Sequence, residues 1–263
     1  MNDRFEYGRI VQIAGIPPEA VFAAVHLHRR ALNGEPAGMV LKKAAKTNVT
    51  LVTAGDGAGS ETICVKEFVR PAALRLLPAA IRHRPAIRSW RAARELLARG
   101  VAVPEPLALV FGPGRSSYLL MRRTAGEEHL RRYVLRRFAD ERSAATRRAF
   151  AGACAEFLCD CWERGVFHQD LKATNLHVRE SATGGWEFEL IDAAAVAFRV
   201  PLSPQEMILN LTQLNSSTPR AMTRTDRLHF MQRVARRRPE LAGREVVREV
   251  LRLSLERGGV WLQ

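Results

Sequence analysis

Hydrophobic positions in the first half of the chain fall in short runs rich in β-branched residues, a composition typical of β-strands. Glycine-rich turns separate several of these runs, for example residues 55–59 and 112–114. An arginine-rich segment in the same half ends at Gly100, and glycine commonly follows the last turn of a helix. The first half therefore predicts the order β-β-β-α-β-β. The expected elements are strands at 39–43, 49–53, 62–69, 106–111 and 118–121, with a helix at 85–99 after the third strand.

From about residue 127 the pattern becomes mainly helical. Apolar side chains recur at a spacing of three or four along 143–164, which places them on one face of a helix. That face carries Phe150, Cys154, Phe157, Leu158 and Cys161. Two short strands are expected next, at 176–179 and 186–191, followed by a helical tail from 203 to about 255 with one break near Pro239.

The chain has 263 residues, of which 47% are hydrophobic and 26% are charged. This composition allows a large domain or two lobes with a buried core, and it excludes a disordered polybasic chain. No apolar run approaches the roughly 20 residues of a membrane-spanning helix, and residues 1–30 carry no signal-peptide core. We therefore expect neither an integral membrane protein nor an exported one. The four cysteines lack metal-ligand spacing, which predicts reduced, mostly buried thiols.

The formal net charge of +14 arises from 36 Arg, 5 Lys and 27 acidic residues, and it is concentrated in two stretches. Residues 70–99 hold eight Arg against one acidic residue, and residues 122–148 hold nine Arg against four. This clustering indicates an anionic partner: nucleic acid, a phosphorylated glycolipid or an acidic membrane surface. Few aromatic residues lie between the arginines and no nucleic-acid-binding motif is present, so nucleic acid is the least favoured of the three.

Residues 168–175 carry the strongest motif, which has the form H-x-D-L-K-x-x-N. A strand pair follows, and its second strand leads to Asp192. Kinases use the same arrangement for the catalytic loop and the metal-binding aspartate. We expect Asp170 to orient the attacking hydroxyl or accept its proton, and Lys172 to face the transferred phosphoryl group. His168 is expected to pack the loop rather than carry protons.

The same motif predicts how a nucleotide and a metal ion are bound. Asn175 and Asp192 offer the hard oxygen ligands that Mg²⁺ prefers. Upstream, residues 63–66 read Ile-Cys-Val-Lys, the form of the third-strand motif whose lysine holds the α- and β-phosphates of ATP. ATP and Mg²⁺ are therefore the expected cofactors, with Lys66, Asn175 and Asp192 as binding residues. The adenine is expected against the connector that begins with Met121.

Over about residues 38–235 the chain also resembles the lipopolysaccharide kinase (Kdo/WaaP) family, a branch of the protein-kinase-like superfamily. Besides the catalytic loop, the resemblance rests on residues 65–68, 89–92, 97–101, 104–108, 117–121, 190–192, 211–216 and 224–228. It implies ATP-dependent phosphorylation of a sugar hydroxyl in a lipopolysaccharide core or a similar glycolipid. It also implies that this reaction takes place at the cytoplasmic face of the inner membrane.

The resemblance implies an α+β, bilobal protein-kinase-like fold, in which a small β-rich N-lobe with one main helix precedes a mainly helical C-lobe. We expect the nucleotide-binding lobe at 1–121 and the catalytic and substrate lobe at 122–263, within one kinase-like domain. The arginines of 70–99 are expected to dock this cytoplasmic enzyme on an anionic membrane as a peripheral protein. Those of 122–148 are equally well explained as a solvated face.

Several positions depart from the kinase pattern. Residues 44–48 occupy the phosphate-covering turn without the glycines of G-x-G-x-x-G. The helix position that usually pairs with Lys66 falls on Ser89, and the helix's acidic residue, Glu95, lies six residues further on. Alanines replace the phenylalanine and glycine that commonly follow the metal-binding aspartate. These departures keep a catalytically weak nucleotide-binding pseudokinase open as an alternative.

A Ser/Thr-type protein kinase is the nearest alternative activity. Protein kinases use the region after the metal-binding aspartate as a platform for peptides. Here 71 residues follow Asp192, with neither an Ala-Pro-Glu motif nor a long activation segment. The sequence therefore favours a glycolipid or sugar acceptor over a protein.

Overall fold

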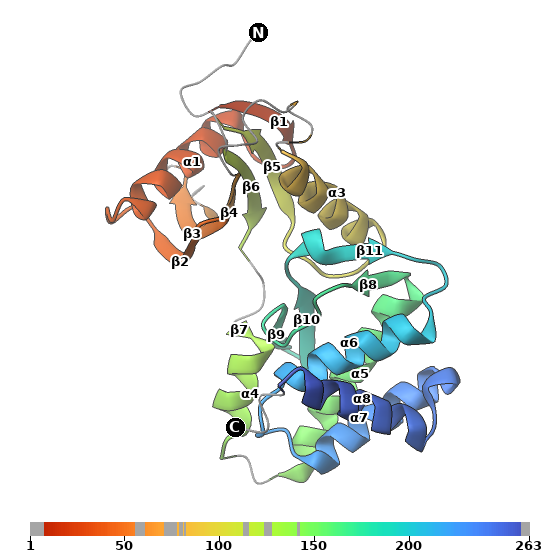
Figure 1. The fold of residues 1–263 in the computed structure, drawn as a ribbon. Helices are drawn as coiled ribbons and strands as arrows, with labels where there is room; N and C mark the ends of the chain where they lie inside the picture. The colour runs from red at the N-terminus through yellow and green to blue at the C-terminus, as the bar shows by residue number, and fades with distance from the viewer. Residues whose placement is uncertain are drawn as a thin grey trace. The chain divides into compact units, whose positions relative to one another are not determined.

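The computed structural model describes residues 8–55, 61–70, 78, 81, 83–112, 116–123, 128–140 and 143–258 (Figure 1). The chain divides into two compact units. Unit 1 comprises Met1–Ala98 and Val103–Thr124, and unit 2 comprises Arg99–Ala102 and Ala125–Gln263. Unit 1 is built around one large sheet, whereas unit 2 is mainly helical.

A six-stranded antiparallel sheet forms the centre of unit 1, with the strand order β1-β5-β6-β4-β3-β2. Successive side chains of a strand point to opposite faces, and directly paired residues of neighbouring strands share a face. The pairing register therefore assigns each strand residue to one face of this sheet. The strands are β1 (Arg9–Ile13), β2 (Met39–Ala44), β3 (Thr47–Ala54), β4 (Glu61–Val69), β5 (Pro106–Phe111) and β6 (Ser116–Arg122).

Two helices cover opposite faces of the sheet (Figure 1). The face against α1 (Pro18–Leu32), here called the α1 face, has a core of Val21, Ala24, Val25, Val52, Ala54, Ile63, Val65, Leu107, Ala108, Val110, Tyr118 and Leu120. The face against α3 (Arg84–Ala98), here called the α3 face, has a core of Phe68, Ala86, Trp90, Leu109 and Leu119. Burial on both faces explains why the central strands β5 and β6 are largely apolar, whereas the edge strand β2 is exposed along its whole length.

The expected order β-β-β-α-β-β is present as β2-β3-β4-α3-β5-β6, and the α+β class is confirmed. Strand β1 and helix α1 precede it and were not anticipated, so the described part of unit 1 has two long helices where one was expected. The buried face of α1 is made of valine, alanine and His28, and it therefore lacks the large aliphatic residues that mark a helix by periodicity. Pro18 and Glu19 in its first turn are the helix-start signal that could have located it.

Helices form most of unit 2, and short strands connect them. The helices are α4 (Leu130–Phe138), α5 (Ala144–Glu163), α6 (Pro204–Ser217), α7 (Arg224–Arg237) and α8 (Arg244–Glu256), with short 3-10 turns at Ala193–Ala195 and Pro239–Leu241. The strands are β7 (Glu128–His129), β8 (Val166–His168), β9 (Leu176–Glu180), β10 (Trp186–Leu190) and β11 (Val196–Phe198). They form a sheet of order β10-β9-β7 and a separate pair β11-β8.

The tail of unit 2 has two breaks where the sequence predicted one. In addition to the break near Pro239, α6 ends at Ser217 and α7 begins at Arg224. Thr223 forms a capping box with Asp226, in which each side chain accepts a hydrogen bond from the other residue's backbone N–H. This capping, together with Pro219 in the connection, favours a new helix over continuation of the old one.

The core of unit 2 is built on α5. Of the residues predicted for its apolar face, Phe150, Cys154, Leu158 and Cys161 are buried and Phe157 is half-buried, which confirms the predicted helix. All four cysteines are free thiols, and three of them are buried. Burial raises the pKa of Cys154 to about 12, so this thiol stays protonated at neutral pH. Among the described helices, none is both long and apolar enough to span a bilayer.

Candidate active site

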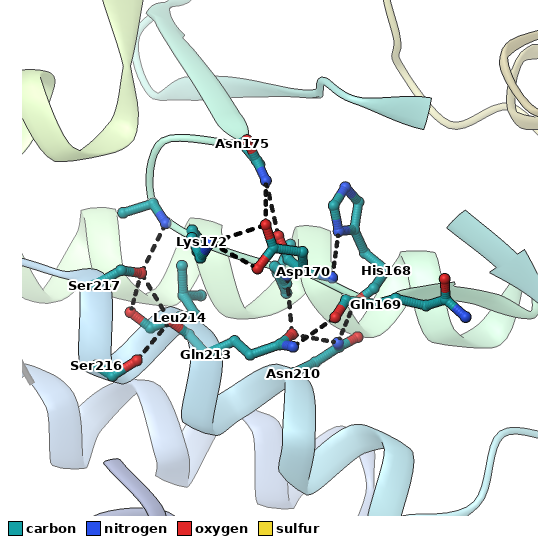
Figure 2. Close-up of polar contacts among 12 residues, drawn as sticks. His168, Gln169, Asp170, Lys172, Asn175, Asn210, Gln213, Leu214, Ser216 and Ser217 are labelled. Carbon is teal, nitrogen blue, oxygen red and sulfur yellow. Dashed lines mark hydrogen bonds and ion pairs between the residues drawn. The ribbon is translucent and has the colours of Figure 1, made fainter. Parts of the chain in front are cut away.

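The loop between β8 and β9 carries the H-x-D-L-K-x-x-N motif, and His168 fixes its first turn (Figure 2). The backbone N–H of Asp170 donates to His168 Nδ1 at 3.2 Å, and His168 Nε2 donates to the carbonyl of Ile191 at 3.1 Å. Burial lowers the pKa of His168 below its ordinary value, which keeps the ring neutral in this arrangement. His168 therefore ties the loop to the end of β10.

Three of the predicted residues meet on this loop (Figure 2). Lys172 Nζ lies 2.9 Å from Asp170 Oδ1 and 3.0 Å from Oδ2. Asn175 Nδ2 donates to the backbone carbonyl of Asp170 at 2.8 Å. A flipped amide would place two oxygens against each other, so this bond leaves Oδ1 as the atom available to a metal ion. The side chain of Asp170 is 40% exposed, so an acceptor hydroxyl can reach it.

Helix α6 holds the backbone of the loop from below, through residues that the motif does not include (Figure 2). Asn210 Nδ2 donates to the carbonyl of His168 at 2.6 Å. Gln213 accepts from the N–H of Leu171 at 2.9 Å and donates to the carbonyl of Gln169 at 2.7 Å. Ser217 Oγ accepts from the N–H of Ala173 at 2.8 Å.

The sequence motif did not predict the supporting role of Asn210, Gln213 and Ser217. Their spacing of three and four residues places them on one side of α6, where Asn210 and Gln213 are buried. Buried polar side chains in a helix must find hydrogen-bond partners, and here these partners are backbone groups of the loop. A polar stripe at helical spacing, set among Met207, Leu211 and Leu214, is the signal that could have identified them.

Asp192 follows β10 and has a left-handed backbone conformation, with φ 59° and ψ 53°. It is the only non-glycine residue with positive φ in the part of the chain that the structure describes. Such conformations are unfavourable for most residues and often occur at functional sites. The backbone N–H of Ile191 donates to the carbonyl of Asn175 at 3.0 Å, so the segments that carry Asp192 and Asn175 are joined directly.

The donor set around Asn175 and Asp192 fits magnesium. Their oxygens are hard ligands, and Mg²⁺ usually keeps several waters and phosphate oxygens. No group of three or more His, Cys, Asp or Glu side chains suited to a metal ion occurs within the described residues.

The two remaining predicted residues, Lys66 and Met121, belong to unit 1. Lys66 lies on β4, with its ammonium 5.2 Å from the centre of the Phe68 ring. Met121 on β6 is paired with Cys64, and Leu119 is paired with Lys66. Lys66 and Met121 therefore both lie on the α3 face. The partner of Met121, Cys64, lies two residues before Lys66 on β4.

Ser89 occupies the position on α3 where the kinase pattern has its acidic residue. It is buried, and its hydroxyl donates to the carbonyl of Pro85 at 3.0 Å. The serine hydroxyl is therefore bound within its own helix.

The described parts of the two arginine-rich stretches lie mainly on α3 and on the segment from the end of β6 to the start of α5. In 122–148, ion pairs connect Arg122 to Glu61 and Glu105, Arg132 and Arg136 to Glu128, Arg137 to Glu180, and Arg147 to Asp226. Much of the charge of this stretch is thus compensated within the chain. In 70–99, the described arginines of α3 that are exposed to solvent are Arg84, Arg88, Arg91 and Arg94.

A cavity of about 970 Å³ lies within unit 2, among α5, α6, α7 and α8. Most of its lining is apolar and includes Phe150, Leu211, Met231, Val250 and Leu251. Arg227 contributes to the lining and donates hydrogen bonds to the carbonyls of Asn215, Thr218, Pro219 and Met222. Burial lowers the pKa of Arg227 to about 10, so its guanidinium remains charged at neutral pH and holds the connection between α6 and α7.

Comparisons with known proteins agree with this geometry. A search of the curated proteins found no match. A solved structure described as WaaP in complex with acyl carrier protein is similar to the chain, with a TM-score of 0.61 and 19% sequence identity. The similarity covers 87% of this chain and 95% of the other, and at this identity it establishes the fold. The model of the lipopolysaccharide kinase (Kdo/WaaP) family matches residues 75–233, which is more than half of the sequence. The chain therefore belongs to the lipopolysaccharide kinase (Kdo/WaaP) family and is a kinase, a phosphotransferase with an alcohol group as its acceptor.

Proposed function

We propose that the protein transfers the γ-phosphoryl group of ATP to a sugar hydroxyl of a lipopolysaccharide core or a similar glycolipid. The observation that carries this proposal is the arrangement of Asp170, Lys172 and Asn175 on one loop held by α6. An accessible carboxylate beside an ammonium group suits attack by a hydroxyl on a phosphate.

In the proposed reaction, Asp170 orients the acceptor hydroxyl and takes its proton. A bond forms between the acceptor oxygen and the γ-phosphorus while the bond from that phosphorus to the leaving ADP oxygen breaks. Lys172, within 3.0 Å of both carboxylate oxygens of Asp170, offsets negative charge on the transferred group. No covalent phosphoenzyme is needed, because donor and acceptor are bound together.

Asn175 and Asp192 are the proposed magnesium ligands, through Oδ1 and the carboxylate respectively. When bound, Mg²⁺ neutralises charge on the phosphates of the nucleotide. Asp192 has a left-handed backbone conformation directly after β10, and the hydrogen bond between Ile191 and Asn175 keeps the two ligand-bearing segments together.

A nucleotide platform on the α3 face of unit 1 supports the choice of ATP. The strand pairing aligns Met39 with Leu51, Leu51 with Cys64, and Cys64 with Met121. This row of apolar side chains suits a planar base, and it includes the residue expected to lie beside adenine. Lys66 lies two residues after Cys64 on the same face of β4, which suits the phosphates that the ribose of such a nucleotide carries.

A transfer assay tests the proposed function directly. Radiolabelled ATP and Mg²⁺ are offered with lipopolysaccharide precursors, with a generic protein substrate, or with no acceptor. Label in the precursor alone supports the proposal, and label in the protein alone favours a protein kinase. Nucleotide binding without transfer to any acceptor would favour a pseudokinase. Asp170→Asn, which retains the size of the side chain but not its basicity, is the control and should not transfer label.

We also propose that the exposed arginines of α3 dock the protein on an anionic membrane, as a peripheral protein at the cytoplasmic face. Arg84, Arg88, Arg91 and Arg94 follow one another at three or four residues and so lie on one side of the helix. Each arginine near such a surface contributes about 1 kcal/mol of binding free energy.

Co-sedimentation with vesicles tests this docking. Binding to vesicles that contain phosphatidylserine should exceed binding to phosphatidylcholine vesicles, and the double variant Arg88→Glu/Arg91→Glu should remove the difference. Arg131→Glu/Arg132→Glu on α4 makes the same charge change on exposed arginines of the other stretch and is the matched control. Equal binding of the wild-type protein to both kinds of vesicle would contradict the proposal.

The apolar cavity of unit 2 favours an additional partner that carries an acyl chain. Its volume of about 970 Å³ and its apolar lining suit a hydrocarbon chain, and the similar solved structure shows WaaP with acyl carrier protein. We propose that the cavity binds the acyl chain of a lipid acceptor or of such a carrier. Replacement of Leu211 by Trp would fill the cavity, and it should abolish binding of a fluorescent fatty acid while leaving nucleotide binding unchanged.

A further inference from the structure

The turn between β2 and β3 is held rigidly, although it lacks the glycines of a phosphate-binding loop. Asn48 Oδ1 accepts from the backbone N–H of Ala44 at 3.0 Å, and its Nδ2 donates to Glu67 at 2.6 Å. The N–H of Val69 donates to the carbonyl of Lys46 at 3.0 Å. Side chains at 44–47 also limit how closely backbone N–H groups approach an anion. In this protein, side chains must therefore supply contacts that glycine-rich loops make with their backbone.

The strand register aligns a second lysine with Lys66. Lys42 is paired with Val49 across β2 and β3, and Val49 is paired with Lys66 across β3 and β4. Neighbouring strands are about 4.8 Å apart, so the two lysines start about 10 Å from each other. Lysine has a flexible four-carbon stem, and two such stems can converge on one polyphosphate held between them.

The neighbouring lysine shows to which face Lys42 belongs. Lys43 Nζ donates to the carbonyl of Leu32 at 2.7 Å, which places Lys43 on the α1 face beside the last turn of α1. Side chains alternate along a strand, so Lys42 lies on the α3 face. Lys66 shares that face, as its contact with Phe68 shows.

The distribution of charge on the sheet favours an anion at this position. Both acidic residues of the six strands, as far as these are described, lie on the α1 face. Glu61 is paired with Ala54 of the α1-face core, and Glu67 lies 3.6 Å from His28 of α1. On the α3 face these strands therefore present Lys42 and Lys66 without an acidic residue from the sheet. Lys42 is exposed to solvent, so a ligand can reach it.

We propose that Lys42 is a second phosphate-binding lysine, which grips the polyphosphate of the nucleotide together with Lys66 and replaces the backbone contacts of a glycine-rich loop. This proposal rests on the proposed function of unit 1 in binding ATP. Lys42 contacts the nucleotide in both the ground state and the transition state. Its removal therefore weakens nucleotide binding more than it slows the chemical step.

Calorimetric titration of the full-length protein with MgATP and with adenosine tests the role of Lys42. Loss of one charged hydrogen bond should raise the dissociation constant for MgATP about tenfold in Lys42→Ala. The dissociation constant for adenosine should not change, because adenosine carries no phosphate. Lys43→Ala removes the same charge one residue away on the other face, and it should bind both ligands like the wild type. In the transfer assay, Lys42→Ala should raise KM for ATP about tenfold and leave kcat within twofold.

The outcomes separate this proposal from the proposed function. If the wild-type protein bound neither MgATP nor adenosine, the proposed function itself would be wrong. If the wild type bound MgATP and Lys42→Ala bound it equally well, only the role of Lys42 would be wrong. Equal weakening of MgATP and adenosine binding in Lys42→Ala would also contradict a phosphate contact, because it would indicate a change in the sheet. If Lys43→Ala weakened MgATP binding to the same degree, a lysine would act equally from either face of the sheet. This result would also contradict a specific contact between Lys42 and the phosphates.

Discussion

Gln213 supports the residues on both sides of Asp170, and its replacement by alanine tests whether this support positions the proposed catalytic carboxylate. Its side chain accepts from the N–H of Leu171 at 2.9 Å and donates to the carbonyl of Gln169 at 2.7 Å. Gln213 is only 3% exposed, so in Gln213→Ala water does not readily replace these bonds. Each buried polar group left without a partner costs about 1–3 kcal/mol. We expect the free energy of unfolding to fall by about 2–4 kcal/mol.

The same substitution should reduce turnover. If the loop relaxes to satisfy its backbone groups, Asp170 moves, and a displacement of about 1 Å can lower the rate on the order of 100-fold. Steady-state kinetics should show a lower kcat with KM for ATP nearly unchanged, and thermal melting should show the loss of stability. Gln205→Ala, on the exposed first turn of the same helix, is the matched control for both measurements. A Gln213→Ala protein with lower stability but wild-type kcat would refute the reasoning, because Gln213 would then stabilise the fold without positioning Asp170.

Three further predictions concern single side chains. Asp170→Ala should abolish phosphoryl transfer while MgATP binding remains close to that of the wild type. Asp192→Ala should abolish transfer and also weaken magnesium-dependent nucleotide binding. Calorimetric titration with MgATP would distinguish the two variants. Burial alone would raise the pKa of Glu67, but the His28 ring and hydrogen bonds from Ser116 and Asn48 outweigh burial and lower this pKa to about 2. Glu67 therefore stabilises the folded state by on the order of 3 kcal/mol above about pH 4.5. This contribution is lost as the pH falls toward about 2. In Glu67→Gln the free energy of unfolding should therefore depend less on pH in this acidic range. Arg227→Met removes a buried guanidinium that binds several carbonyls and should lower the free energy of unfolding by about 3 kcal/mol in urea denaturation.

The contacts within the proposed catalytic loop could be predicted from sequence because they are local. Asp170, Lys172 and Asn175 lie within six residues of one another, and a short turn brings them together whatever surrounds it. Strands β2 to β6 of unit 1 were also predictable, because short runs rich in β-branched or apolar residues are separated by turn residues. Strand β1 was not predicted.

The support of the loop and the first helix could not be predicted in the same way. Gln213 binds a backbone N–H and a backbone carbonyl, which almost every residue possesses. The sequence therefore does not show which residues Gln213 contacts. Helix α1 buries His28 rather than a large aliphatic residue, because His28 Nδ1 lies 2.8 Å from Thr50 Oγ1 in a polar network beneath the helix. Both features depend on tertiary contacts between segments far apart in sequence, and periodicity does not report such contacts.

The support of the catalytic loop by α6 has a consequence for the time at which the protein becomes active during synthesis. The hydrogen bonds from α6 join residues 42 to 44 positions apart in the chain. A nascent chain that ends after β10 already contains Asp170, Lys172, Asn175 and Asp192, but the helix that shapes their loop has not been made. Contacts of such long range form late, after the intervening chain has been ordered. The growing chain therefore contains the proposed catalytic groups well before α6 can hold their loop, and we expect an unfinished chain to transfer no phosphate.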